Sequence, residues 1–223
     1  MVSRRQCLLN AYTITTCPSC SSSISHPDAS GTPQVLVTYT NEGGVQENLD
    51  LLPLLSEESY LKAYPEERRA RAFLELCREG DLEGVVSILQ DTESEEGDSD
   101  SDGEEDDEEE EDEVDVKQLS VEELLRYQDP LQENQSALQC AVQAGSREIA
   151  WLLLFLASAL PLSEFPDEVL RECERRGFVR GAETEGMVDI RGFRDVEGRS
   201  AEDVAREVGE VWQEWVGRGW LVV

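Results

Sequence analysis

The chain has 223 residues, enough for one medium domain or two small ones with a buried core. It carries 50 acidic residues against 19 basic ones, a formal charge of −31. This charge excludes direct binding to nucleic-acid phosphates or to an anionic membrane, because both require clustered cations. A basic protein partner is compatible with it.

The acidic residues are concentrated in one segment. Residues 91–115 contain 18 of them and no Lys or Arg, and the rest of the chain carries a charge of only −13. Like charges at this density repel one another and form no core, so we expect residues 91–116 to be a disordered insertion. The EF-hand spacing is absent, so weak counterion binding is expected rather than a calcium site. Acidic residues three positions later make candidate acidophilic-kinase sites of Thr92, Ser99 and Ser101.

The N-terminal 48 residues are expected to form a disordered leader. Residues 1–32 are rich in Ser, Thr and Cys, contain no acidic residue before Asp28, and show no hydrophobic periodicity. Few acids together with some Arg are also a feature of mitochondrial transit peptides, and this alternative stays open. Residues 34–40 could form a strand, but a single strand has nothing to pair with.

A C-x-x-C pair lies in this leader. Cys17 and Cys20 could bind zinc together with Cys7 and His26, the one histidine of the chain. The intervening residues are mostly Ser and Thr, and no second pair of this kind follows. We therefore expect reduced thiols in a tail and no metal, with zinc binding as the alternative.

The helical part of the chain has no sequence features of an active site. Cys77, Cys140 and Cys173 stand singly within helical patterns, which is typical of small buried thiols, and no histidine is available there as a base. No catalytic activity and no cofactor are therefore expected. The longest apolar run, residues 149–162, has 14 residues, fewer than the roughly 20 that a membrane span needs. Since no secretory signal opens the chain, the sequence indicates a soluble protein of the cytoplasm or nucleus.

Apolar residues recur at helical spacing from about residue 65 onward, interrupted by Gly and Pro. Pro65 followed by two Glu begins one helix, and Gly80 ends it. Ser120 and Glu123 have the spacing of a capping box. No convincing sheet emerges, so the expected fold class is all-α, built from short antiparallel helix pairs. The expected helices cover residues 65–79, 82–89, 120–127, 136–144, 147–159, 166–176, 200–208 and 210–216.

The expected helix over residues 147–159 is apolar on more than one face. Such a helix is buried on two sides. We expect the helix over residues 166–176 and the region of Trp212 and Trp215 to cover it.

One stretch of the sequence resembles an ankyrin repeat. Residues 136–153 read SALQCAVQAGSREIAWLL, against the ankyrin pattern T-P-L-H-x-A-A-x-x-G-x-x-E-I-V-x-L-L. A hydroxyl that caps the first helix, a small residue between helices and a glycine at the turn serve the same physical roles in both. The matching positions are Ser136, Leu138, Ala141, Gly145, Glu148, Ile149, Leu152 and Leu153.

Two weaker copies flank this stretch. Residues 73–89 are similar to an N-terminal ankyrin repeat with Gly80 at its turn. A second copy near the C-terminus is similar to the G-x-T-P-x-D-x-A-x-x-x-G form of terminal repeats. Its matching positions are Asp195, Gly198, Ser200, Ala205 and Gly209.

The spacing of the turn glycines fits this resemblance. Gly145 and Gly209 are 64 positions apart, close to two ankyrin periods of about 33. Gly177 lies midway, but no second apolar helix follows it. Residues 163–180 are therefore either half a repeat or an inserted helix.

The resemblance implies a short ankyrin-like helix-pair solenoid, with a first repeat over residues 49–90 and further repeats over 117–223. It also implies a non-enzymatic protein–protein interaction module, expected to be monomeric, that binds a partner through its repeat loops and first helices. The alternative is an acidic escort or chaperone for a basic client, such as a histone or ribosomal protein, that uses residues 91–115. The candidate partner-binding residues are Gln132, Glu133, Asn134, Gln135 and Gln139.

Overall fold

The computed structural model describes residue 16 and residues 20–91, 119–180 and 188–223. The candidate phosphorylation sites Thr92, Ser99 and Ser101 lie outside the described residues, as does the acidic insertion apart from Asp91. The chain divides into two units, Met1–Pro65 and Glu66–Val223, which are described separately.

The first unit contains two antiparallel strand pairs and one helix. The longer pair is a β-hairpin in which Leu36 faces Asp50 and Asn41 faces Gly44. Asp50 joins this hairpin to the helix, because its carboxylate accepts hydrogen bonds from the Leu52 amide, which it caps, and from the Val35 amide, at 3.1 and 2.9 Å. The elements are β1 His26–Pro27, β2 Pro33–Gln34, β3 Leu36–Asn41, β4 Gly44–Asp50 and α2 Leu51–Ala63.

The second unit begins with a helix pair joined at a glycine. A short 3₁₀ helix, Pro65–Glu67, leads into α3 (Arg68–Glu79), and α4 (Leu82–Gln90) follows. Gly80 ends α3 at φ +74°, a left-handed conformation that glycine adopts without steric cost. The expected end of the helix at Gly80 is confirmed.

A second helix pair repeats this design. The capping box of Ser120 and Glu123 is confirmed at the start of α5 (Val121–Leu125). A two-stranded hairpin, β5 (Gln128–Asp129) and β6 (Gln135–Ser136), leads directly into α6 (Ala137–Gln143). Gly145, at φ +74°, then turns the chain into α7 (Arg147–Ala157).

The C-terminal part is less regular. Helix α8 (Asp167–Arg175) ends before Gly177 and has no helical partner after it in the described residues. Helix α9 (Ala201–Val208) is followed by a 3₁₀ helix of three residues, Glu210–Trp212. The expected helix over residues 210–216 is therefore wrong beyond its first turn, where the ring of Trp212 is fully buried and donates a hydrogen bond to the carbonyl of Val142 on α6 at 2.9 Å.

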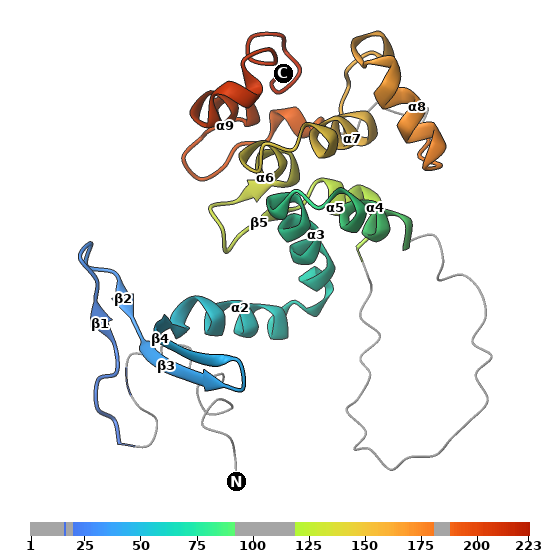
Figure 1. Cartoon of the computed structure of the whole chain (residues 1–223). Helices are drawn as coiled ribbons and strands as arrows, with labels where there is room; N and C mark the ends of the chain where they lie inside the picture. The colour runs from blue at the N-terminus through green and yellow to red at the C-terminus, as the bar shows by residue number, and fades with distance from the viewer. Residues whose placement is uncertain (1–15, 17–19, 92–118, 181–187) are drawn as a thin grey trace, which may run out of the picture. The chain divides into compact units, whose positions relative to one another are not determined.

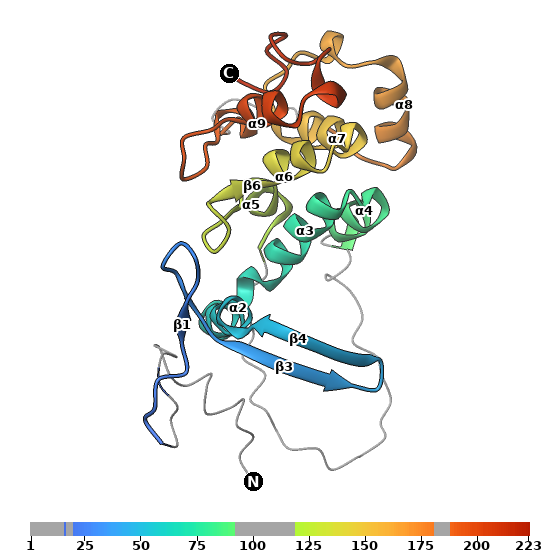
Figure 2. The same ribbon diagram turned by 60° about the vertical axis from the view of Figure 1, so that its left-hand side comes forward.

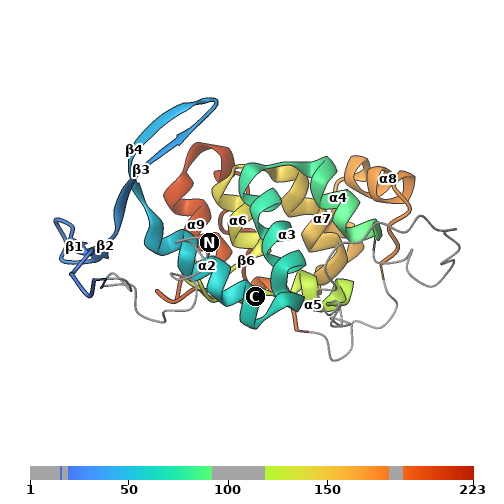
Figure 3. The ribbon, with the colours of Figure 1, turned by 90° about the horizontal axis from the view of Figure 1, so that it is seen from below.

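The first helices of the pairs lie side by side. Helix α6 packs against α3 on one side and against α9 on the other, and Figures 1 and 2 show the three helices in this order. Helix α4 packs against α7, as Figure 3 shows from below. Ala137 and Ala141 of α6 are fully buried, and their short side chains permit close approach of the neighbouring helices.

Helix α7 is buried on more than one side, as its composition indicated. Trp151 contacts the rings of Phe165, Trp215 and Trp220, with centroids 5.3, 4.4 and 5.1 Å away. The cover comes from α8, which packs against α7 as expected, from Phe165 just before it, and from the C-terminal tryptophans. No helix in the described residues combines the length and apolarity needed to cross a bilayer.

The expected fold class, an all-α helix-pair solenoid with a disordered leader, is wrong. Three two-stranded antiparallel sheets are present in the described residues, so the fold is mixed, although mostly helical. Two of these sheets lie in the segment expected to be a disordered leader, where β4 supplies the partner that the strand over residues 34–40 lacked. The helix pairs also fail to continue regularly past α7.

Candidate functional site

The candidate partner-binding residues lie on the hairpin that precedes α6. The loop of residues 130–134 connects β5 to β6, whose pairing joins Gln128 to Ser136 and Asp129 to Gln135. Because β6 runs straight into α6, the loop is held at the N-terminal end of that helix. Ser136 caps the helix through a capping box with Gln139.

Asp129 anchors the loop to the preceding helix pair. Its carboxylate is fully buried and lies 2.6 Å from the guanidinium of Arg71 and 3.3 Å from that of Arg78. It also accepts a hydrogen bond from the Leu131 amide at 2.9 Å. One carboxylate therefore ties α3 to the loop, and the two arginines offset the cost of burying its charge.

The backbone of the loop has a fixed and uncommon conformation. Glu133 and Asn134 have φ values of +54° and +59°, a region that non-glycine residues rarely adopt. The amides of Gln132 and Asn134 donate to the carbonyl of Asp129, and the carbonyl of Glu133 accepts from the Val196 amide at 2.8 Å. These bonds hold the side chains of residues 131–133 outward, where they are exposed.

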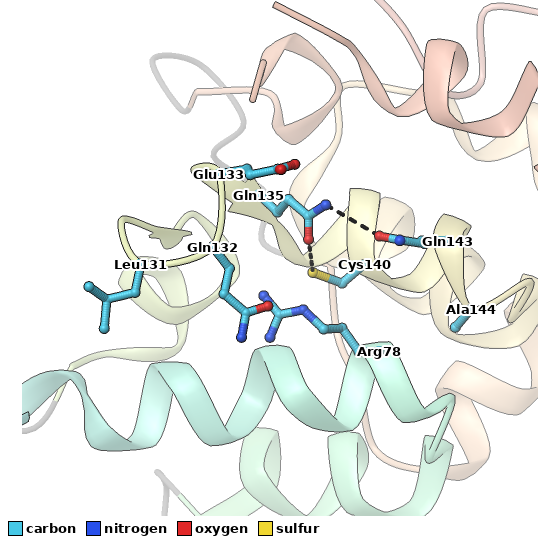
Figure 4. Close-up of a pocket in the computed structure, with 8 residues that line it drawn as sticks. All are labelled: Arg78, Leu131, Gln132, Glu133, Gln135, Cys140, Gln143 and Ala144. Atoms are coloured by element: carbon cyan, nitrogen blue, oxygen red, sulfur yellow. Dashed lines mark hydrogen bonds between the residues drawn. The ribbon is translucent and has the colours of Figure 1, made fainter. Parts of the chain in front are cut away.

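An open depression of about 490 Å³ lies between this loop, α3 and α6. Figure 4 shows Arg78 reaching from α3 toward the side-chain amide of Gln132, below the sulfur of Cys140. The amide of Gln135 spans the depression, donating to Gln143 at 3.2 Å and lying 3.9 Å from the sulfur of Cys140. The lining residues are Arg78, Leu131, Gln132, Glu133, Gln135, Cys140, Gln143 and Ala144.

The groups at this depression are suited to binding rather than to covalent chemistry. Arg78 is 17% exposed and pairs with Glu75 at 2.9 Å as well as with Asp129. Burial raises the pKa of the Cys140 thiol to about 11, an effect that the charge of Arg78 only partly opposes, so the thiol is protonated at neutral pH. The remaining polar groups are the carboxylate of Glu133, which pairs with Arg199 at 3.2 Å, and side-chain amides, which donate and accept hydrogen bonds but do not titrate.

The structure brings most of the candidate partner-binding residues together. Gln132, Glu133 and Gln135 line the depression, and Asn134 lies between them with partial exposure. Gln139 does not face a partner: it is 1% exposed, completes the capping box with Ser136 and donates to the carbonyl of Arg199 at 2.8 Å. Its polar side chain supports the loop that the others occupy.

The residues that match the ankyrin pattern lie at turns, at helix caps and in the core. Gly80, Gly145, Gly198 and Gly209 all have positive φ, and Ser136 and Ser200 both begin helices through capping boxes. Buried positions are occupied by Leu138, Ala141, Leu152, Leu153 and Ala205.

Asp195 is a second copy of the Asp129 arrangement. Its side chain is fully buried, accepts hydrogen bonds from the amides of Glu197 and Arg199, and pairs with the Arg199 guanidinium at 2.7 Å. A buried aspartate therefore precedes the capping serine of both α6 and α9.

The contribution of α3 to the depression, through Arg78, was not predicted from the sequence. Arg71 and Arg78 are seven positions apart, which places them on one face of α3. Arg71 is 8% exposed among the apolar residues of that face, a position where an arginine is unusual unless it is paired. An arginine within an apolar helical stripe was thus the sequence signal for a buried ion pair. The signal does not identify the partner, Asp129, which is 58 positions away.

In the described residues, no group of three or more His, Cys, Asp or Glu side chains is placed to hold a metal ion. Cys20 is exposed, but Cys7 and Cys17, two of the other candidate zinc ligands, lie outside the described residues.

Comparison with family models, with curated proteins and with solved structures gives no match for this chain.

Proposed function

We propose that this chain is a non-enzymatic protein-interaction module of the ankyrin-repeat type, which binds a protein partner at the depression between the β5–β6 loop, α3 and α6. The observation that carries the proposal is the convergence of Gln132, Glu133 and Gln135 with Arg78 around this depression. These residues come from a fixed loop and a packed helix, so the site needs little ordering when it binds.

The packing of the helix pairs supports a protein-interaction module. Two helix pairs turn at glycines with φ +74°, and in each pair the first helix packs beside the first helix of its neighbour. Buried aspartates hold the loops before α6 and α9. Residues 131–133 of the loop before α6 are exposed and are available to a partner.

The role of this depression in partner binding can be tested by filling it with larger side chains. In the full-length protein, the double variant Gln132→Arg/Ala144→Arg places two long cationic side chains at its edge. A matched control, Gln213→Arg/Ala72→Arg, makes the same types of change at exposed positions that do not line the depression. We expect affinity capture with quantitative mass spectrometry to show proteins that the wild type and the control retain but the depression variant loses.

The proposal is wrong if both double variants retain the same proteins in the same amounts. Circular dichroism and thermal unfolding of each variant establish that the fold is retained. Loss of one set of partners in both variants would point to added positive charge rather than to the depression.

A second candidate function is an acidic escort for a basic client. The observation that favours it is the charge of residues 91–115, with 18 acidic residues and no basic one. Binding of this kind is long-range and is screened by salt.

The escort function can be tested by deleting residues 92–115. We expect the deletion to reduce capture of basic proteins strongly at low ionic strength, and salt to weaken capture by the wild type. Capture that is insensitive to salt and to the deletion would rule this function out.

A further inference from the structure

A second depression, of about 650 Å³, lies beside Leu119, the first described residue after the acidic segment. Side chains from the 3₁₀ helix before α3, from α5 and from the loop after it, and from residue 188 line it. We refer to it as the glutamate-lined depression. Its residues are Glu66, Glu67, Leu119, Glu122, Glu123, Arg126, Tyr127 and Val188.

The floor of the glutamate-lined depression is apolar. Leu119 and Tyr127 are partly buried and pack against the hydrophobic core, which fixes their positions. The Tyr127 hydroxyl donates to the carboxylate of Glu67 at 2.6 Å, so the ring is also held at its polar end. Val188 contributes an apolar side chain that is 57% exposed. Covering this apolar floor with another apolar side chain would therefore be favourable, because both apolar surfaces are removed from water.

The rim of this depression is negatively charged. Four glutamates face one cation, Arg126, whose guanidinium donates to the carbonyls of Val188 and Glu122 at 3.1 and 3.0 Å. Among the described residues, Arg126 makes no ion pair, and neither do Glu66 and Glu122. Arg126 therefore leaves these two carboxylates available for cations from another molecule.

The chain connects this depression to the acidic segment. Asp115, the last acid of the segment, precedes Leu119 by four residues, and four residues of extended chain span at most about 14 Å. A partner seated in the depression would therefore experience the negative potential of both. Potentials of one sign concentrate oppositely charged partners and raise their association rate.

We propose that the glutamate-lined depression docks a basic segment of a partner protein that carries a large apolar side chain between Lys or Arg residues. The apolar side chain covers Leu119, Tyr127 and Val188, and the flanking cations pair with Glu66 and Glu122. This inference deepens the second candidate function, because it adds a specific docking surface to a diffuse electrostatic attraction.

The test uses the full-length protein and two short fluorescein-labelled peptides. The first peptide has one Phe between Lys residues, and the second has Ser in place of that Phe. Fluorescence anisotropy gives the dissociation constant of each. We expect the wild type to bind the Phe peptide about tenfold more tightly than the Ser peptide, because one aromatic side chain becomes buried.

Two pairs of variants separate the depression from overall charge. Glu66→Gln/Glu122→Gln should weaken binding of both peptides severalfold, whereas Glu174→Gln/Glu210→Gln, the same change in charge at exposed glutamates elsewhere, should have little effect. Val188→Ser should weaken binding of the Phe peptide only, and Val196→Ser, at a valine that is 69% exposed outside the depression, should change neither.

The outcomes also separate this inference from the escort function. Deletion of residues 92–115 should weaken the binding of both peptides, but the protein should still bind the Phe peptide more tightly than the Ser peptide. If the deletion abolishes binding while the Glu66/Glu122 and Val188 variants bind like the wild type, the escort function stands and the docking surface is overturned. Equal weakening by the two glutamine pairs, or equal wild-type affinity for the two peptides, would also overturn it.

Discussion

The guanidinium of Arg71 lies 2.6 Å from the carboxylate of Asp129, and both side chains are buried, with 8% and 0% exposure. The two residues are 58 positions apart, on α3 and on β5. Their ion pair therefore joins the first helix pair of the second unit to the loop that forms the candidate site.

Replacement of Asp129 by Asn should strongly destabilise the second unit. It removes the negative charge that pairs with the buried Arg71 and with Arg78, and loss of one partner of a buried pair costs about 3 to 5 kcal/mol. Urea titration followed by tryptophan fluorescence measures the loss, because all four tryptophans lie in this unit.

Glu133→Gln is the control for this substitution. Glu133 is in the same loop, but its carboxylate is 59% exposed in its ion pair with Arg199, so the free energy of unfolding should change by less than about 1 kcal/mol. Equal effects of the two substitutions would show that the buried pair does not anchor the loop.

Gly145→Ala should destabilise the α6–α7 turn through backbone strain. At φ +74° a Cβ atom costs about 1 to 2 kcal/mol, although the space is open enough that the nearest atom of Val211 would be 3.8 Å away. Gly145→Val should cost more, because a β-branched side chain is less tolerant of this conformation. Thermal unfolding followed by circular dichroism measures both.

Gly192→Ala is the matched substitution. Gly192 lies in the 3₁₀ helix Ile190–Gly192, has no positive φ, and would bring its Cβ within 4 Å of nothing. It should leave the melting temperature nearly unchanged. A comparable decrease for both alanine variants would contradict the strain explanation.

Trp212→Ala should uncouple the C-terminal segment from α6. The ring is fully buried, donates to the Val142 carbonyl and lies edge-on to Trp215 with centroids 4.9 Å apart. Truncation of a buried aromatic residue costs about 3 to 5 kcal/mol. Chemical unfolding followed by far-ultraviolet circular dichroism measures this without relying on the removed fluorophore.

Trp220→Ala should have the smaller effect. Trp220 is only partly buried, and its indole donates to the Glu164 carboxylate at 3.1 Å in an exposed position. If Trp220→Ala destabilised the protein more than Trp212→Ala, the assignment of Trp212 as the main anchor would be wrong.

The ion pairs at the C-terminal end of α8 should make the stability of the protein depend on pH. Hydrogen bonds from Arg175 and Arg176 lower the pKa of Glu172 to about 2, and Arg176 also reaches Glu83 on α4 at 2.5 Å. Because this pKa is lower in the folded state than the ordinary 4.5, Glu172 contributes stability above about pH 4.5 and loses it as the pH falls toward 2.

Urea titrations at a series of acidic pH values test this dependence. Glu172→Gln should be less stable than the wild type above pH 4.5, and the difference should shrink toward pH 2. A difference that stays constant over this range would mean that the substitution acts through packing and not through charge.

Several elements of the second unit could be predicted because their causes are local. Gly80 and Gly145 end helices where glycine alone avoids a steric cost, and Ser120 with Glu123 caps α5 within four residues. Gln139 was misread for a related reason. A glutamine three residues after a capping serine is itself part of the cap, and here it is buried.

The first unit was harder to predict. Strand β4 is exposed over most of its length, so it lacks the alternation of apolar and polar residues that marks a strand with one buried face. Helix α2 begins at Leu51, which places Pro53 in its first turn, where the missing amide hydrogen has no intrahelical acceptor to lose. The proline was therefore no obstacle to the helix.

The sequence by itself determined where the helices of the second unit up to α9 begin and end, and which of them is buried on two sides, because caps, turn glycines and apolar spacing act over a few residues. Only the tertiary structure decided that Arg71 and Arg78 meet Asp129, that Trp212 inserts against α6, and that β3 has a partner. These contacts join residues from different elements, and no periodic pattern in the sequence relates the two partners. Their geometry follows from how whole elements pack, and the positions of both candidate depressions follow from the same packing.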